Sequence, residues 1–286
     1  MIVRPSEVSA RDFYAFMVGA VVPRPIAFVS SMSRKGKVNL SPYSFFNAFS
    51  AKPPVLVFGP VNSMRDGSTK NTLDNVLEHE EVTVNIVNYK MVAQMSLSST
   101  AYPRGVNEFE KSGLSEAPSE LVAPPRVAEA PVSFECKVSQ IIRLGREGGA
   151  GNLVVCEVLQ MHISDEVLNE TGSIDPHQLD AVGRMGGSAY CRASGPAIFE
   201  TLRPGREHGI GVDQLPEAIR QSPVLTGSDL ALLANVAELP SATPSNNQTV
   251  QTTSAQASLE DRHALAQQYL RKGDVDSAWA VLLEKK

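Results

Sequence analysis

The apolar residues of the first 200 positions fall in short runs that turn residues interrupt, and this spacing most restricts the folds open to the chain. Five such runs are predicted to be strands, at 26–31, 55–58, 82–87, 134–142 and 153–163. The glycine-rich stretch between the last two predicts a hairpin loop. Strands that follow one another in this way favour a barrel or a sandwich over a doubly wound parallel sheet.

Two segments within this region have the spacing of helices instead. Apolar residues recur at helical intervals in 69–80, through Leu73, Val76 and Leu77, and again in 88–97. We therefore expect a mainly β domain over residues 1–200 with a few added helices.

The composition excludes several classes of protein. The 286 residues carry a formal net charge of −5, which argues against nucleic acid as the main partner. The three cysteines form no C-x-x-C motif and are typical of a reducing compartment. No apolar stretch approaches the ~18 residues of a membrane span, and the N-terminus lacks a signal-peptide pattern. We expect a soluble, cytoplasmic protein.

The C-terminal third has a different organisation. Residues 201–239 read as an extension with short helices, followed by the uncharged stretch 240–258, which predicts a flexible linker. Residues 259–286 then predict two helices that form a hairpin. Ser258 and Asp261 resemble a capping box at its start, and Gly273 separates the two helices.

The motifs of several enzyme classes are missing. The chain has no G-x-G-x-x-G motif after a strand, no Walker A motif, no H-E-x-x-H and no G-x-S-x-G. Its five histidines are scattered, without a pair at helical spacing. The sequence therefore does not favour a hydrolase or a metalloenzyme, and we predict no metal site and no acid–base dyad.

Two polar segments could bind a ligand. Asn39, Ser41, Ser44 and Asn47 place short neutral donors and acceptors in an otherwise apolar region, which suits a polyol or the edge of a heterocycle. The same residue types are common in hairpin turns for purely local reasons. The pattern alone leaves both readings open.

The second segment is DGSTKNTLDNV at 66–76. Ser68 or Thr69 can cap a helix there, with Lys70, Asn71 and Thr72 in its first turn. Free backbone N–H groups, the helix dipole and one cation then suit a phosphate. The alternative is a plain helix cap with a solvated lysine, although a lysine in a first turn opposes the dipole unless an anion is present.

Five motifs, in this order, resemble the flavin reductase-like family. They are PRPIAFVSS at 23–31, NLSPYSFFN at 39–47, KNTxxNV at 70–76, GVNEFEKSGL at 105–114 and VGRMGGxxY at 182–190. The resemblance implies a six-stranded antiparallel split β-barrel, a homodimer, and FMN bound near the subunit interface. The linker and the helical hairpin lie outside it.

The resemblance also implies a set of FMN-binding residues. The residues that would line the isoalloxazine ring and the ribityl chain are Ser30, Ser31, Asn39, Leu40 and Ser41. Ser44 and Phe45 would lie close to the ring. Lys70, Asn71 and Thr72 would hold the phosphate, and Phe109 and Arg184 would be contacts at the rim. Asn71 departs from the family pattern, which often has aspartate, and the amide removes a negative charge beside the phosphate.

The function expected on this basis is an NAD(P)H-dependent flavin reductase that transfers hydride to FMN, with NADH or NADPH as the donor. Three alternatives stay open: an FMN electron carrier, a reductase component that serves a separate monooxygenase, and a non-enzymatic interaction module. The last would use the C-terminal hairpin, which carries Trp279 and resembles part of a tetratricopeptide-type repeat.

Overall fold

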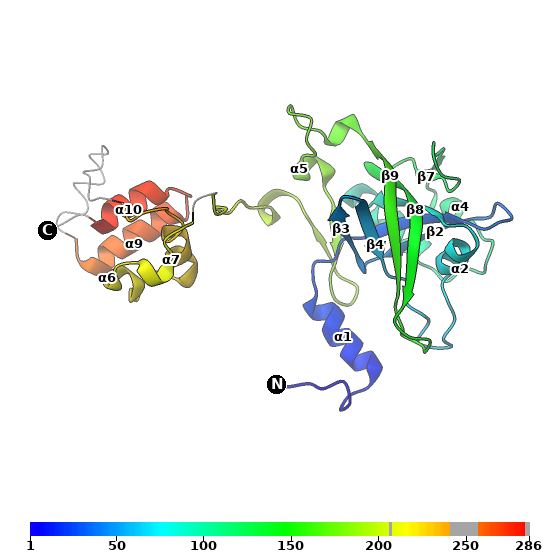
Figure 1. The fold of residues 1–286 in the computed structure, drawn as a ribbon, viewed down its shortest axis with the longest axis horizontal. Helices are drawn as coiled ribbons and strands as arrows, with labels where there is room; N and C mark the ends of the chain where they lie inside the picture. Colours follow the sequence, from blue (N-terminus) through cyan, green and yellow to red (C-terminus); the bar gives the residue numbers. More distant parts are fainter. Residues whose placement is uncertain (206–207, 241–256, 284–286) are drawn as a thin grey trace. The chain divides into compact units, whose positions relative to one another are not determined.

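A computed structural model describes residues 1–205, 208–240 and 257–283 of the chain (Figure 1). The chain divides into two compact units, Met1–Ile198 and Phe199–Lys286. Most of the predicted linker, 241–256, lies outside the described residues. No helix in the described part of the chain is long and apolar enough to cross a bilayer.

The first unit is built on one seven-stranded sheet in the order β2-β1-β5-β8-β9-β4-β3, in which every neighbouring pair is antiparallel. The strands are β1 (Ala27–Met32), β2 (Val38–Tyr43), β3 (Phe46–Ala51), β4 (Pro54–Phe58), β5 (Glu81–Ile86), β8 (Val132–Arg143) and β9 (Asn152–Ile163). Two small ribbons join β6 (Glu116–Ala117) to β7 (Arg126–Val127) and β10 (Val182–Arg184) to β11 (Tyr190–Arg192).

All five predicted strands are confirmed, as β1, β4, β5, β8 and β9. The predicted count of six strands is not confirmed, because the sheet has seven strands and the described residues do not close it into a barrel. The strands of the seven-stranded sheet that the apolar pattern missed are β2 and β3. The first carries Asn39, Ser41 and Pro42, and the second is exposed along most of its length, so neither shows a buried strand's pattern.

Helices cover both faces of β1. On one face, α2 (Asn71–Glu78) packs Leu73 and Val76 into a cluster with Ala27 and Val29. On the other face, Phe28 lies in a second cluster that includes residues of α3 (Val92–Ser98) and α4 (Glu108–Ser112). Because successive side chains of a strand point to opposite faces, β1 is buried on both. The predicted helix at 88–97 is divided into a 3-10 turn, η1 (Tyr89–Met91), and α3.

The remaining elements of the first unit lie at its ends and edges. They are α1 (Ala10–Ala20), α5 (Pro176–Leu179) and the 3-10 turns η2 (Asp165–Val167) and η3 (Gly195–Ala197). Ser9 caps α1 by accepting a hydrogen bond from the backbone of Asp12 at 3.1 Å. No residue of α1 is buried.

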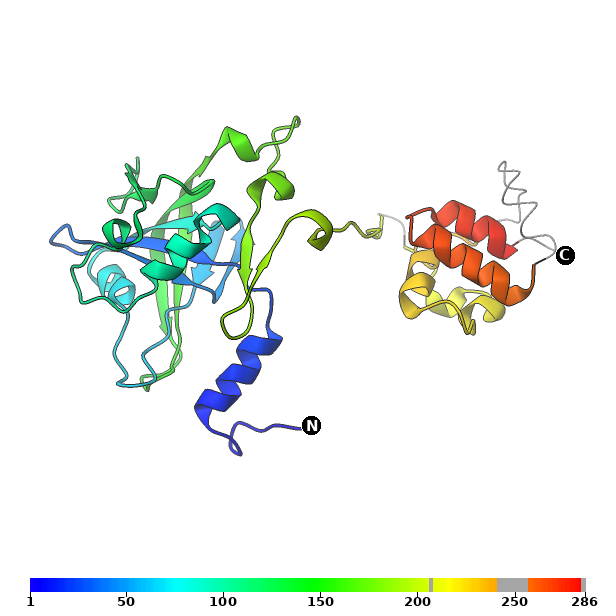
Figure 2. The ribbon, with the colours of Figure 1, turned by 180° about the vertical axis from the view of Figure 1, so that it is seen from behind.

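The second unit is helical. It contains η4 (Val212–Gln214), α6 (Glu217–Arg220), α7 (Gly227–Leu233), α9 (Leu259–Leu270) and α10 (Val275–Leu283). Figure 2 shows α9 and α10, in orange and red, side by side as a hairpin. The 201–239 segment shares one hydrophobic cluster with this hairpin, in which Ile219 and Leu233 meet Leu270 and Trp279. The indole Nε1 of Trp279 donates to the carbonyl of Leu233 at 3.2 Å.

Candidate functional site

The N-terminus of α2 carries no side-chain cap. The helix begins at Asn71, and its N-cap residue, Lys70, makes no capping hydrogen bond. The prediction that Ser68 or Thr69 caps the helix is therefore wrong: both hydroxyls donate to aspartate side chains at 2.6 Å instead. Among the described residues no side chain accepts from the first-turn N–H groups, and the first turn holds one carboxylate, that of Asp74. The free N–H groups at the positive end of the helix dipole are available to an anion.

Four buried side chains link α2 to β1 and β2, and we call them the polar seam: Ser31, Asn39, Thr72 and Asn75. The amide of Asn39 donates to Thr72 Oγ1 at 2.9 Å, and the amide of Asn75 donates to Ser31 Oγ at 3.1 Å. Ser31 and Asn39 are also cross-strand partners. Since buried polar groups are strongly held when they are paired, the seam fixes the position of α2 against both strands.

A pocket of about 670 Å³ opens beside the polar seam, within the range of about 300–1,000 Å³ that small-molecule sites occupy. We call it the basic pocket, because its lining has four cationic side chains and one carboxylate. The lining residues are Ser33, Arg34, Lys35, Lys37, Val38, Asn39, Asn71, Asn75, Glu78, Arg104 and Gly105.

Two of the four cationic side chains contact Glu78, one at its carboxylate and one at its backbone carbonyl. Arg104 pairs with Glu78 Oε1 at 2.6 Å, and the side chain of Arg34 donates to the Glu78 carbonyl at 3.0 Å. The hydrogen bond from Arg104, and then the backbone N–H of Arg34, hold the pKa of Glu78 below its usual value. Within the described residues, the ammonium groups of Lys35 and Lys37 have no ion-pair partner, so the pocket keeps a positive charge.

Two of the predicted site residues, Ser44 and Arg184, meet at Arg24. The Nε of Arg24 donates to Ser44 Oγ at 3.4 Å, and its backbone pairs with that of Arg184 through bonds of 3.0 and 2.8 Å. The ring of Phe45 lies edge-on to Tyr14, with centroids 6.2 Å apart.

Arg24 itself was missed by the sequence reasoning. Its guanidinium donates to the carbonyls of Val18, Val21 and Met185, and burial lowers its pKa. The only signal was its place between two prolines in the PRP motif.

The other predicted residues are mostly covered. Ser30, Leu40 and Phe109 are no more than 1% exposed, and Ser30 Oγ has no hydrogen-bond partner in the described part of the chain, whereas Ser41 is half-buried on β2. The backbone N–H of Leu40 donates at 2.9 Å to the carboxylate of Glu108, whose pKa burial raises. Glu108 therefore occupies an outward donor of the edge strand β2, and no sequence pattern indicated that role.

Two of the three cysteines, Cys136 and Cys156, are buried and serve packing. Burial raises the pKa of Cys136 to about 12 and that of Cys156 well above its usual value, so both stay as thiols near neutral pH. In the described residues, no group of three or more His, Cys, Asp or Glu side chains is arranged to hold a metal ion.

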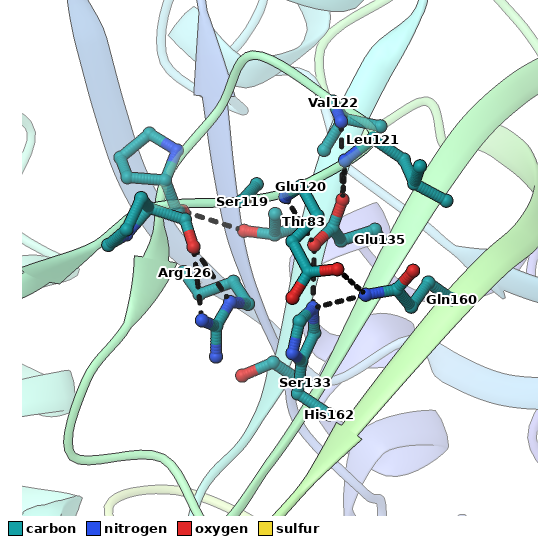
Figure 3. A network of polar contacts seen from close by, with 12 residues as sticks. Thr83, Ser119, Glu120, Leu121, Val122, Arg126, Ser133, Glu135, Gln160 and His162 are labelled. Carbon is teal, nitrogen blue, oxygen red and sulfur yellow. Dashed lines mark hydrogen bonds and ion pairs between the residues drawn. The ribbon is translucent and has the colours of Figure 1, made fainter.

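A separate polar network binds the loop between β6 and β7 to the sheet (Figure 3). The fully buried carboxylate of Glu135 on β8 accepts from the backbone N–H groups of Glu120, Leu121 and Val122 at 2.9, 2.6 and 3.2 Å. The ring Nε2 of His162 lies 2.6 Å from the same carboxylate. Burial alone would raise the pKa of Glu135, but the backbone donors and His162 more than offset it, and the pKa is lowered.

The lowered pKa of Glu135 predicts a pH-dependent contribution to stability. A carboxylate with a depressed folded pKa stabilises the fold above its unfolded pKa of about 4.3, and the contribution is lost as pH falls through the folded pKa. We expect the urea midpoint of wild type to exceed that of Glu135→Gln at pH 7 and the gap to narrow from about pH 5 downward. A gap that stays constant from pH 7 to pH 3 would contradict this account.

The residues that form the sheet match a known protein family. The model of the flavin reductase like domain matches residues 18–181, which is more than half of the chain. The chain belongs to the flavin reductase-like family. A protein of Aquifex aeolicus is 36% identical over 189 residues, covering 66% of this chain and 94% of its own length.

Solved structures of the flavin reductase-like type are similar to the first unit. Nitrilotriacetate monooxygenase component B from Bacillus cereus has 28% identity and a TM-score of 0.65, and covers 71% of this chain and 98% of its own. The 2-nitrobenzoate 2-nitroreductase NbaA from Pseudomonas fluorescens has the same identity and TM-score, with 74% and 100% covered. A split-barrel protein from Shewanella frigidimarina, at 21% identity, shows the fold alone, with a TM-score of 0.60 and 71% and 100% covered.

Proposed function

We propose that this protein binds FMN and reduces it with NADH or NADPH. The observation that carries the proposal is the uncapped N-terminus of α2, with Lys70 exposed beside it and Asn71 at the edge of the basic pocket, inside a flavin reductase-like domain. A helix end that lacks its own cap and has a nearby cation is suited to a phosphate.

The residues present fit FMN. The phosphate would lie at the first turn of α2, where Lys70 supplies charge and Asn71 an amide, while Thr72 orients Asn39. Ser44 and Phe45 would approach the ring, and Phe109 and Arg184 would lie at its rim. The segments that would line the ring and the ribityl chain carry Ser30, Ser31, Leu40 and Ser41. When bound, FMN supplies the two-electron chemistry, accepting hydride from the nicotinamide. The chain then needs only to bind, orient and exclude water.

A second candidate function rests on one specific observation. One of the two similar structures with a TM-score of 0.65 is nitrilotriacetate monooxygenase component B. By analogy with it, this protein would pass its reduced flavin to a separate oxygenase. An electron carrier that never uses NAD(P)H is the remaining flavin-based alternative.

A homodimer is part of the same proposal. None of the residues of α1 is buried, and the apolar side chains of Phe16 and Met17 on this helix are 48% and 45% exposed. Phe49 on the edge strand β3 is 68% exposed. Exposed apolar side chains of this size on the first unit would be covered by an interface with a second copy.

The test of this function is a visible spectrum of the protein purified and supplied with FMN, followed anaerobically by NADH and then NADPH. A flavin band near ~450 nm that bleaches with either nucleotide is the expected result and identifies the donor. Bleaching with dithionite alone would favour the electron carrier. Absence of any bound flavin would overturn the proposal.

Lys70→Ala tests the phosphate position. Loss of the cation is expected to weaken FMN binding by about 1.5–3 kcal/mol, the range of hydrogen bonds to charged groups. The measurement is the dissociation constant from quenching of FMN fluorescence, with the exposed Lys52→Ala as the control of equal charge change. An unchanged FMN affinity in Lys70→Ala would remove this lysine from the site.

A further inference from the structure

Arg24 lies where three segments of the first unit meet, and the residue is only 6% exposed. Its Nη1 donates to the carbonyls of Val18 and Val21 at the end of α1. Its Nη2 donates to the carbonyl of Met185 in the β10–β11 loop at 3.1 Å, and its Nε donates to Ser44 Oγ at 3.4 Å. One guanidinium therefore joins α1, the β10–β11 loop and the segment that follows β2.

We propose that Arg24 is a positioning residue for the flavin ring, because it holds these three segments in the arrangement that the ring side of the site requires. We define the ring-side assembly as α1, Arg24, residues 44–45 and residues 183–189 of the β10–β11 ribbon. The inference rests on the proposed function for the presence of a flavin. It goes beyond that function by assigning the ring and the phosphate to two separately held parts of the site.

The C-terminal end of α1 depends on the guanidinium of Arg24. The helix has 11 residues, none of which is buried, and its last turn contains no basic residue. A helix this short is marginal without tertiary contacts, and its last carbonyl groups lack partners inside the helix. The guanidinium gives donors to two of these carbonyls, and its positive charge lies at the negative end of the helix dipole. Loss of Arg24 is therefore expected to release the end of α1.

The β10–β11 ribbon lies against the same end of α1 (Figure 2). A Cβ atom added to Gly186 would lie 3.3 Å from the Cα atom of Gly19, so the loop and the helix meet backbone to backbone. The ribbon also carries Arg184, a predicted contact at the rim of the ring. The backbones of Arg24 and Arg184 exchange hydrogen bonds of 3.0 and 2.8 Å. We therefore expect a displacement of α1 to displace Arg184 as well.

Phe45 connects α1 to the ring side by a second contact. Its ring lies edge-on to that of Tyr14 on α1, with the centroids 6.2 Å apart. Three of the residues predicted to lie near the flavin ring thus belong to the ring-side assembly: Ser44, Phe45 and Arg184. In the described part of the chain, the end of α2 that would hold the phosphate shares no hydrogen bond with this assembly, since its side chains bond to β2 and to the loop between α3 and α4. The ring and the phosphate would therefore be held by two separate parts of the fold.

Arg24→Gln tests this separation, because riboflavin carries the ring of FMN without its phosphate. Dissociation constants for FMN and riboflavin are measured on the full chain by quenching of flavin fluorescence. Arg24→Gln removes the charge and most of the donors, so both ligands are expected to bind at least about tenfold more weakly, and by the same factor. Lys70→Ala, by contrast, is expected to weaken FMN and to leave riboflavin within about twofold of wild type.

Two further variants serve as comparisons for binding. Arg24→Lys keeps the charge but places it on one ammonium group, which cannot reach all the acceptors of the guanidinium, so its losses should be smaller. The matched control is Arg192→Gln, on β11 of the same ribbon, whose half-exposed guanidinium pairs with Asp180 outside the assembly at 2.7 Å. Exposed ion pairs contribute little, so this control should leave both affinities within about twofold of wild type.

Hydrogen exchange of the full chain without ligand gives a readout that needs no flavin. In Arg24→Gln, protection is expected to fall in α1 and in residues 183–189, and to persist in β5 and β8 inside the sheet. Gly186→Val repeats the test without changing Arg24, because its side chain would push the ribbon away from Gly19. This variant is expected to reproduce both the exchange pattern and the equal losses for the two flavins.

Equal losses for FMN and riboflavin, with faster exchange confined to α1 and residues 183–189, would support the inference. A loss for FMN alone in Arg24→Gln, unchanged riboflavin affinity, or unchanged protection of α1 would overturn it. If Arg24→Gln also exposes β5 and β8, Gly186→Val decides, and the same exposure there would overturn the inference in favour of a general role in folding. Wild-type protein that binds neither flavin would instead overturn the proposed function, and the exchange experiment would still show whether Arg24 holds the assembly.

Discussion

Replacing Glu135 with alanine is expected to lower the free energy of unfolding of the first unit by about 3–5 kcal/mol, because several donors lose a shared acceptor and a buried donor left unsatisfied costs about 1–3 kcal/mol. The carboxylate is fully buried and is the acceptor for three backbone N–H groups and for His162. Alanine leaves all of these donors without their acceptor, and an unsatisfied buried donor costs more than a lost hydrogen bond. The loop between β6 and β7 would also lose its attachment to β8.

Urea unfolding followed by far-UV circular dichroism, combined with hydrogen exchange of the 118–126 loop, measures this effect. Trp279 is the chain's one tryptophan and lies in the second unit, so the fluorescence transition should stay in place. Glu157→Ala, at an exposed position on the neighbouring strand β9, is the control and should change stability by no more than about 0.5 kcal/mol. Equal effects of the two substitutions, or unchanged protection of the loop, would show that the network contributes little.

Replacing Trp279 with alanine is expected to unfold the second unit and leave the first intact. The indole is 2% exposed, packs among residues of α7, α9 and α10, and donates to the Leu233 carbonyl. Truncating a buried tryptophan costs about 3–5 kcal/mol. In the described part of this unit, the helices are no longer than the 12 residues of α9, and helices this short are marginal without tertiary packing.

Hydrogen exchange resolved along the chain measures the result, since protection should vanish from α9 and α10 and persist in β5 and β8. Trp279→Phe is the matched control, because it keeps most of the buried area and loses only the indole hydrogen bond and some volume. Retained protection of α9 in the alanine variant would contradict the account.

The FMN affinity of the same variant is a second measurement. Unchanged FMN affinity would show that binding resides in the first unit, while lost affinity would implicate the helical unit in FMN binding.

Local sequence pattern predicted the parts of the fold in which apolar residues follow a period. Val82 and Val84 alternate with polar residues and form β5, and Leu73 and Val76 recur at helical spacing and form α2. These patterns are read within a few residues, because burial of one face of a strand or helix imposes them directly. The helix whose N-terminus forms the candidate phosphate site could be predicted for the same reason, whereas the phosphate site itself stays a prediction.

Strands without that period were not predictable. β2 carries polar residues because it faces α2 and the basic pocket, and β3 is an exposed edge strand. Their pairing depends on partners that lie elsewhere in the chain, so no local window shows it. Ser68 and Thr69 are residue types that often cap helices, but their hydroxyls donate to the carboxylates of Asp66 and Asp74 instead.

The sequence by itself determined the alternation that makes a sheet, the helix that presents Lys70 and Asn71, and the family, since all of these are written in short contiguous patterns. Only the tertiary structure decided which polar groups meet. Asn39 reaches Thr72, Arg104 reaches Glu78, and Glu135 reaches the 120–122 backbone across wide separations in sequence. Contacts of this kind depend on how strands and loops pack in space, and a buried polar group takes whichever partner the packing supplies.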